Sequence, residues 1–159
     1  MKEIASFTVN HLKLLRGIYV SRKDQCGDTW LTTFDLRLKE PNREPVMNTA
    51  ELHTIEHIGA TFLRNDPEMK DDIVYFGPMG CRTGCYLIMK GNLEATDAVD
   101  LVTRMFRFIE NYEGVIPGAA AEHCGNHLDM NLPMARYEAH RYVTEILDHL
   151  TDENLNYPE

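Results

Sequence analysis

Two apolar periodicities, and the order in which they occur, constrain the fold of this chain most strongly. Residues 28–38 (DTWLTTFDLRL) alternate as a strand does, with an acid and a base, Asp35 and Arg37, on the same face. Residues 49–64 instead repeat apolar side chains every three or four positions, which predicts an amphipathic helix ended by Asn-Asp-Pro at 65–67. Because no single kind of element satisfies both periods, the chain needs a sheet and helices together.

The remaining segments place the strands before most of the helices. A short apolar run at 73–76, the loop GPMGCRTG and the strand-like CYLIMK predict two paired strands. Further helices are expected over 96–111 and from Leu132 to about Leu150. Since strands and helices do not alternate strictly, we expect an α+β fold with a mostly antiparallel sheet and helices packed on one face. No repeat or linker interrupts residues 1–159, so we expect a single domain.

Charge and composition exclude several classes of partner. Lys and Arg number 16 against 25 Asp and Glu, and the net charge of −9 is opposite to that of a protein that tracks nucleic-acid phosphates. No apolar run approaches the roughly 20 residues that a membrane helix needs. The four cysteines follow no recognisable secretory signal, so free thiols or metal ligands are expected and the predicted location is cytoplasmic. Neither nucleic acid nor a membrane is an expected partner.

The motif His-Thr-Ile-Glu-His at 53–57 is the strongest local signal of chemistry. Residues four apart lie on one helix face, so the imidazoles of His53 and His57 can reach a single cation. Glu56 lies beside that face, and the order His-x-x-Glu-His is the inverted form of a zinc-peptidase motif. Two solvated surface histidines are the alternative, but the apolar opposite face of this helix favours a metal site.

A catalytic metal site takes three protein ligands and leaves one position for water or substrate. The third ligand is expected within AAAEHCGNHLD, which contains Glu122, His123, Cys124 and His127. We favour Cys124, because the Gly-Asn that follows keeps it on a turn and a thiolate is the strongest donor in the group. His123 and His127 remain alternatives, and a small buried cysteine without a metal is a further interpretation.

Cys81 lies in the Gly- and Pro-rich loop at 77–84. Backbone N–H groups and the charge of Arg82 favour a thiolate there, which would serve as an acid or base near neutral pH; an inert loop thiol is the alternative. Cys85 is interpreted as structural. A metal with two separate proton-transfer groups suits enolisation and elimination next to a carbonyl. An inverted-motif metallopeptidase, which needs no loop thiol, and a non-catalytic metal-stabilised binding module are the alternatives.

Five motifs in the same order resemble those of the S-ribosylhomocysteine lyase family, the quorum-sensing enzymes that make the autoinducer-2 precursor. They are SFTVNH at 6–11, FDLRLKEPN at 34–42, HTIEH at 53–57, GPMGCRTG at 77–84 and CGN at 124–126. The resemblance implies a four-stranded antiparallel sheet and a homodimer with active sites at the subunit interface. It also implies a metal-dependent lyase of methionine metabolism that converts S-ribosyl-L-homocysteine to L-homocysteine and 4,5-dihydroxy-2,3-pentanedione by carbonyl migration and β-elimination.

The same resemblance implies a role for each site residue. One ferrous ion per subunit, with zinc or cobalt as substitutes, would be bound by His53, His57 and Cys124. The two acid/base groups would be Cys81 and Glu56. The substrate would be contacted at its ribose end by Ser6, His11 and Arg37, and at its amino-acid end by Arg64.

Overall fold

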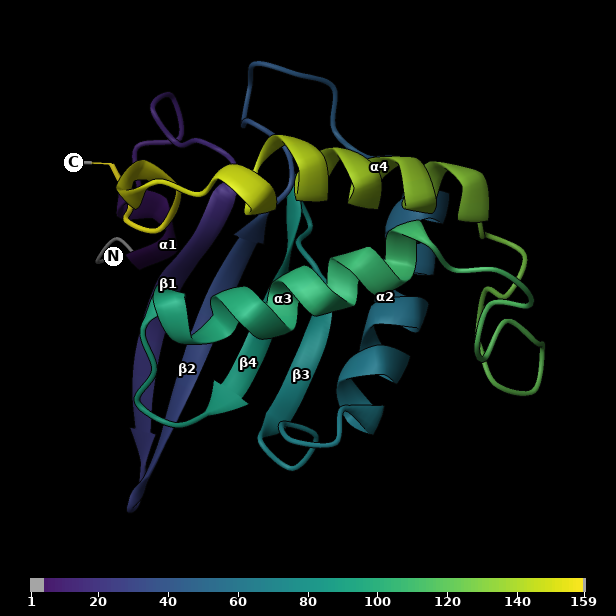
Figure 1. Ribbon diagram of the computed structural model, residues 1–159, viewed down its shortest axis with the longest axis horizontal. Helices are drawn as coiled ribbons and strands as arrows, with labels where there is room; N and C mark the ends of the chain where they lie inside the picture. The colour runs from purple at the N-terminus through teal and green to yellow at the C-terminus, as the bar shows by residue number, and fades with distance from the viewer. Residues whose placement is uncertain (1–4, 159) are drawn as a thin grey trace.

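The computed structural model describes residues 5–158, with side chains from residue 7 onward, and has an α+β fold. Its antiparallel sheet has the strand order β1-β2-β4-β3, formed by β1 (Gly17–Cys26), β2 (Thr29–Arg37), β3 (Ile73–Pro78) and β4 (Gly84–Lys90). One face of this sheet is covered by α2 (Thr49–Asn65), α3 (Ala95–Glu110) and α4 (Leu132–Glu145) (Figure 1). The short elements are α1 (Ala5–Thr8), η1 (Leu147–His149) and η2 (Asp152–Asn154). The predicted α+β class, the antiparallel sheet and the helices on one face are confirmed.

The hydrophobic core lies between the sheet and the three longer helices. Phe34 and Leu36 of β2 and Leu87 of β4 are fully buried there, because alternate residues of a strand point to the same side. They pack in one cluster with side chains at three- and four-residue spacing on the helices, including Ile55, Ile58, Val102, Met105, Phe106, Ile109, Tyr142 and Val143. Burial of these periodic stripes is the main source of helix stability, since isolated helices of this length are marginal in water.

Two features of the fold differ from the sequence-based prediction. The strand β1 was not predicted, because only Ile18 to Val20 are apolar and the rest of this edge strand is polar and more exposed. The last helix was expected to reach about Leu150, but α4 ends at Glu145. Ile146 leaves the helical region with φ −126° and ψ −62°, and a single 3-10 turn follows.

The opposite face of the sheet is polar in its centre. Tyr19 of β1, Asp35 of β2 and Tyr86 of β4 are cross-strand partners in one row, and Arg37 lies two residues beyond Asp35 on the same face. Asp35 and Arg37 are nevertheless buried, and they form an ion pair with 2.5 Å between Oδ2 and Nη2. Buried charges of this kind require partners and a cover of other segments.

Segments from both ends of the chain supply that cover. The α1 turn and the C-terminal segment lie side by side at the β1 end of the sheet (Figure 1). The Asn154 side chain donates to the carbonyl of Arg16, and the Tyr19 hydroxyl donates to the carbonyl of Glu153. The C-terminal segment is thereby fixed to the start of β1.

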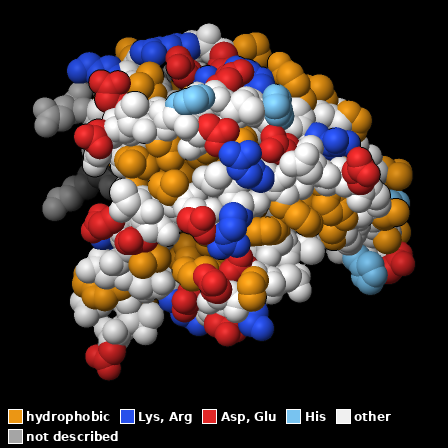
Figure 2. All heavy atoms as spheres, viewed as in Figure 1, with side chains coloured by type: hydrophobic (Ala, Val, Ile, Leu, Met, Phe, Trp, Pro, Cys, Tyr) orange, Lys and Arg blue, Asp and Glu red, His pale blue; other side chains and the backbone are white. Residues whose placement is uncertain are grey.

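The surface over the helices carries charges of both signs. Figure 2 shows acidic and basic side chains interspersed on this face, with apolar side chains between them. Several form ion pairs along or between helices, such as Arg141 with Glu145 and Arg107 with Asp148. Within residues 5–158, no helix is long and apolar enough to cross a membrane.

Gly84 is required where β4 begins, because the backbone of β2 lies very close to it. A Cβ atom at this position would lie 2.2 Å from the carbonyl oxygen of Leu36. We expect Gly84→Ala to lower the free energy of unfolding by about 1–3 kcal/mol, since the two strands would have to move apart. Gly80→Ala, in the preceding loop, is the matched control because a Cβ there meets no atom within 4 Å. Denaturant unfolding checks both, and equal stability of the two variants would contradict the expectation.

Candidate active site and metal centre

The metal motif lies on α2, whose other side is packed into the core. His53 and His57 are partly buried, whereas Ile55 and Ile58 on the opposite side are fully buried against the sheet. The two imidazole rings meet edge to face, with 4.6 Å between their centroids. The packing of the helix therefore holds both rings on its outer side, one turn apart as the sequence predicts.

Backbone carbonyls fix the orientation of both rings. The Nδ1 atom of His53 lies 3.0 Å from the carbonyl oxygen of Asp129, and that of His57 lies 2.7 Å from the carbonyl oxygen of Pro117. Because a carbonyl oxygen can only accept a hydrogen bond, each Nδ1 carries the proton and each neutral ring keeps a lone pair on Nε2. Metal-binding histidines commonly have this second hydrogen bond. Gly118, at φ +68°, lies against the His57 ring and forms the turn after Pro117.

Cys124 completes the cluster from the loop between α3 and α4. Its Sγ lies 3.4 Å from Nε2 of His53, and the backbone N–H of Asn126 donates to the same sulfur over 3.4 Å. One ligand atom from each of His53, His57 and Cys124 lies within 4.8 Å of the other two. The cluster includes neither His123 nor His127, so of the alternatives considered from sequence the structure favours Cys124.

These three residues fit a divalent transition metal. In a tetrahedral site with metal–ligand bonds of about 2.0–2.3 Å, nitrogen and sulfur ligands lie about 3.5 Å apart, close to the distance between His53 and Cys124. Two neutral imidazoles and one thiolate are ligands for zinc, iron or cobalt rather than for calcium or magnesium. With only three protein ligands, such a site keeps a position open for water or substrate.

Glu56 lies next to the cluster and faces the β3–β4 loop. It lines a cavity of about 320 Å³ together with His53, Asp129 and loop residues that include Met79 and Gly80. Its carboxylate forms no hydrogen bond or ion pair with another described residue. It also contributes to raising the pKa of Tyr75, after the larger effect of burial. A carboxylate in this position is free to exchange a proton with a molecule bound at the cluster.

The loop that carries Cys81 is a tight turn between β3 and β4. The backbone N–H of Arg82 donates to the carbonyl of Met79 over 2.9 Å, and Arg82 adopts a left-handed φ of 60°. This turn leaves the Cys81 side chain exposed, in contrast to Cys85, which is fully buried. Burial raises the pKa of the Cys85 thiol, which agrees with a structural role.

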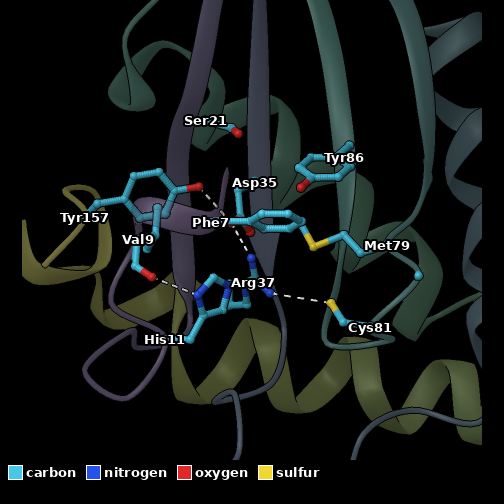
Figure 3. Close-up of a pocket in the computed structure, with 11 residues that line it drawn as sticks. Phe7, Val9, His11, Ser21, Asp35, Arg37, Met79, Cys81, Tyr86 and Tyr157 are labelled. Atoms are coloured by element: carbon cyan, nitrogen blue, oxygen red, sulfur yellow. Dashed lines mark hydrogen bonds and ion pairs between the residues drawn. The ribbon is translucent and has the colours of Figure 1, made fainter. Parts of the chain in front are cut away.

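Cys81 opens into a second cavity, on the polar face of the sheet (Figure 3). This cavity, of about 230 Å³, is lined by side chains from α1 and the following loop, β1, β2, β4 and the C-terminal segment, among them Phe7, His11, Ser21, Asp35, Arg37, Tyr86 and Tyr157. Two residues expected from sequence to contact the substrate, His11 and Arg37, are therefore brought together with Cys81. The Nδ1–H of His11 donates to the carbonyl of Val9 over 2.8 Å, which holds the ring.

Arg37 provides positive charge beside the Cys81 thiol. Its Nη1 lies 3.8 Å from Sγ of Cys81 and 2.5 Å from Oγ1 of Thr83, and that hydroxyl lies 3.0 Å from the same sulfur. Burial acts against the charge of Arg37, but Asp35 outweighs this effect, so the pKa of Arg37 is raised and the guanidinium stays charged. A guanidinium and a hydroxyl therefore both lie within contact distance of the Cys81 sulfur.

The two cavities lie on either side of the same loop. Met79 and Gly80 line both of them, but the cluster residue His53 lines one and Cys81 lines the other. A chemistry that uses the cluster and Cys81 on one substrate molecule thus requires both cavities to contribute. Within the described residues of one chain, the two cavities are separate and do not form one continuous pocket.

Two further residues were expected to contact the substrate, and the structure places neither side chain in a cavity among the residues it describes. The side chain of Ser6 lies outside the described residues, although its backbone belongs to α1. Arg64 is exposed near the end of α2 and donates to the carbonyl of Val74 over 2.9 Å. The expected contact of Arg64 with the amino-acid end of the substrate stays a prediction.

Sequence reasoning missed several residues that form the second cavity. Asp35 was visible as the acid beside Arg37 on one strand face, and this spacing was a usable signal of a buried pair. Thr83 and Tyr157 had no such signal, because their contacts with Cys81 and Asp35 depend on the turn and on the path of the C-terminal segment.

We expect His57→Ala to weaken the binding of cobalt(II), used as a spectroscopic probe, by about a hundredfold or more, since loss of even an outer-shell partner costs 10–100-fold. His127→Ala is the matched control, as it removes a nearby imidazole that is not in the cluster. Titration of metal-free protein followed by visible absorption measures both affinities. Equal weakening in the two variants would mean that the cluster does not hold the metal.

Comparisons with known proteins agree with this geometry. Residues 4–153 match the family model described as S-Ribosylhomocysteinase (LuxS). The chain is 59% identical over 158 residues to a protein of Clostridium beijerinckii named S-ribosylhomocysteine lyase, covering 99% of both chains. Proteins with the same name from Clostridium acetobutylicum and Phocaeicola vulgatus are 58% and 57% identical, over 100% and 99% of this chain and 100% and 98% of theirs. This chain therefore belongs to the S-ribosylhomocysteinase (LuxS) family.

Proposed function

We propose that this chain is a metal-dependent S-ribosylhomocysteine lyase. It cleaves S-ribosyl-L-homocysteine to L-homocysteine and 4,5-dihydroxy-2,3-pentanedione, the precursor of autoinducer-2. The single observation that carries the proposal is the cluster of His53, His57 and Cys124, whose donor atoms converge beside Glu56 in a chain of this family. The names of the relatives support the same substrate and reaction.

The native ion in this proposal is ferrous iron, with zinc or cobalt as substitutes, held by the three cluster residues. When bound, the cation polarises a carbonyl oxygen of the ring-opened sugar and stabilises the negative charge that develops there. The two neutral imidazoles and the thiolate leave the ion a net positive charge, which this chemistry needs. The free thiols at positions 26, 81, 85 and 124 suit the reducing cytoplasm that we propose as the location.

Cys81 is the base for carbonyl migration. As a thiolate it removes the proton from C2 of the open-chain sugar and returns it at C1, while the hydroxyl proton of O2 passes to O1. The carbonyl thereby moves from C1 to C2 without net change in composition. A second round moves the carbonyl to C3. The guanidinium of Arg37 and the hydroxyl of Thr83 lie beside the sulfur and are placed to contact it between these transfers.

Glu56 is the base for the elimination. With the carbonyl at C3, the proton on C4 is acidic and the thioether sulfur on C5 is in the β position. Glu56 takes the C4 proton, the electron pair forms the C4–C5 double bond, and the C5–S bond breaks. The homocysteine sulfur leaves with the electron pair of the C5–S bond and is then protonated, and the remaining enol converts to the diketone.

A second copy of the chain brings the two cavities together. Cys81, His11 and Arg37 line one cavity, and His53 with Glu56 lines the other. We propose a homodimer with a two-fold axis, in which the metal centre of one subunit faces the Cys81 cavity of its partner. A two-fold interface pairs each such surface twice, which gives two complete sites per dimer.

Replacing either proposed acid/base group should stop the reaction without removing the metal. We expect Cys81→Ala and Glu56→Gln to keep one metal per chain and to lose turnover by a factor of about 10² or more. Cys26→Ala, which removes an exposed thiol remote from both cavities, is the control. Metal analysis and titration of released thiol measure the two properties, and wild-type turnover in either variant would remove that residue from its role.

Mixing two inactive variants tests the shared site. Cys81→Ala and His57→Ala subunits, unfolded and refolded together, form heterodimers with one intact and one doubly altered site. Because half of a random mixture is heterodimer, activity should recover to about a quarter of wild type. Two Cys81→Ala preparations mixed in the same way are the control. No recovery in dimers shown by mass to be mixed would place each complete site within one chain.

A further inference from the structure

Tyr157, two residues from the C-terminus, touches the far side of the ion pair that faces Cys81. Its hydroxyl donates to Oδ2 of Asp35 over 2.8 Å, and the same oxygen accepts from Nη2 of Arg37. Arg37 then extends Nη1 toward Thr83 and Cys81 (Figure 3). A continuous set of polar contacts thus joins the C-terminal tyrosine to the reactive sulfur.

The ring of Tyr157 is held firmly enough to position a partner. It stacks on Tyr19, with 4.8 Å between ring centroids and 11° between planes. The backbone just before it is tied to β1 through Asn154 and Glu153. Burial, followed by the charge of Asp35, raises the pKa of Tyr157, so its hydroxyl remains a donor over the whole neutral range.

The hydroxyl of Tyr157 affects how much of the Arg37 charge is available to Cys81. Asp35 Oδ2 receives two donors, while Asp35 Oδ1 has no hydrogen-bond partner among the residues that the structure describes. Without the tyrosine hydroxyl, Arg37 would be the one remaining side-chain donor to this buried carboxylate within the described part of the chain. The guanidinium would then be drawn toward Asp35. The negative charge of the carboxylate would be less fully neutralised by its donors, so it would act more strongly on the sulfur of Cys81.

We propose that Tyr157 is a positioning residue of the active site, which acts through Asp35 and Arg37 to hold positive charge against the Cys81 thiol. This inference rests on the proposed role of Cys81 as acid/base group. It gives the end of the chain a role in setting the reactivity of a loop more than 70 residues away in sequence.

The other titratable and charged groups near Cys81 stay the same in every variant of the experiment described below. Besides Tyr157, the charged or titratable side chains that line its cavity, or lie next to it in the chain, are His11, Asp35, Arg37, Arg82 and Tyr86, and Cys85 lies beneath the loop. Replacing only the Tyr157 hydroxyl leaves all the others in place, so their contributions cancel in the comparison.

The test follows alkylation of Cys81 by iodoacetamide as a function of pH, in full-length, metal-loaded protein without substrate. Trypsin separates the two neighbouring cysteines, because cleavage after Lys70, Arg82 and Lys90 puts Cys81 in peptide 71–82 and Cys85 in peptide 83–90. Mass spectrometry then reports the modification of Cys81 alone. Since no turnover is measured, the result does not depend on the lyase activity itself.

For Tyr157→Phe we expect the pH of half-maximal alkylation rate to move upward by about half a unit or more. Tyr19→Phe is the matched control, because it removes the hydroxyl of the stacked ring, which donates to backbone carbonyls rather than to Asp35. This variant should stay within about 0.2 units of wild type. Thermal unfolding of both variants verifies that they are folded at the temperature of the assay.

Two outcomes would overturn the proposal. One is a midpoint for Tyr157→Phe that matches wild type, which would leave the tyrosine with a packing role only. The other is an equal shift in Tyr19→Phe, which would assign the effect to loosening of the C-terminal segment. If Tyr157→Phe is unfolded, we measure Tyr157→His instead, which restores a ring N–H donor. The proposal then requires the alkylation midpoint of Tyr157→His to match that of wild type.

Discussion

The packing of one helix on the sheet is the constraint on which the candidate site depends. The buried side of α2, with Ile55 and Ile58, fixes the rotation of the helix, so the imidazoles at 53 and 57 must lie on its outer side. Carbonyls of the α3–α4 loop accept hydrogen bonds from both Nδ1 atoms, and Nε2 of His53 then lies 3.4 Å from Sγ of Cys124. Metal affinity in such a site depends on this outer shell as well as on the ligands.

A second constraint is that the two chemical halves of the site belong to different faces of the fold. The helix side supplies the metal cluster and Glu56, whereas the polar sheet face supplies Cys81 with its buried guanidinium. The β3–β4 loop, through Met79 and Gly80, borders both halves. In the homodimer that we propose, a two-fold axis would join the two half-sites of each subunit with those of its partner into two whole sites.

Local patterns in the sequence predicted the parts of this structure that depend on local contacts. The alternation in β2 and the helical spacing in α2 indicated both elements to within a residue or two, and the i, i+4 histidines indicated their shared face. The edge strand β1 and the early end of α4 were not predicted, because neighbouring segments rather than propensity determine them. The contact of Tyr157 with Asp35 joins positions 122 residues apart, so no local pattern contains it.

The most direct test of the account is release of free thiol from S-ribosylhomocysteine by the iron-loaded protein under anaerobic conditions. The account predicts one homocysteine thiol for each substrate consumed, loss of this release when a chelator removes the metal, and recovery when ferrous iron is returned. A metal-free protein that releases thiol at the same rate as the loaded one would contradict it, as would an iron-loaded protein that releases none.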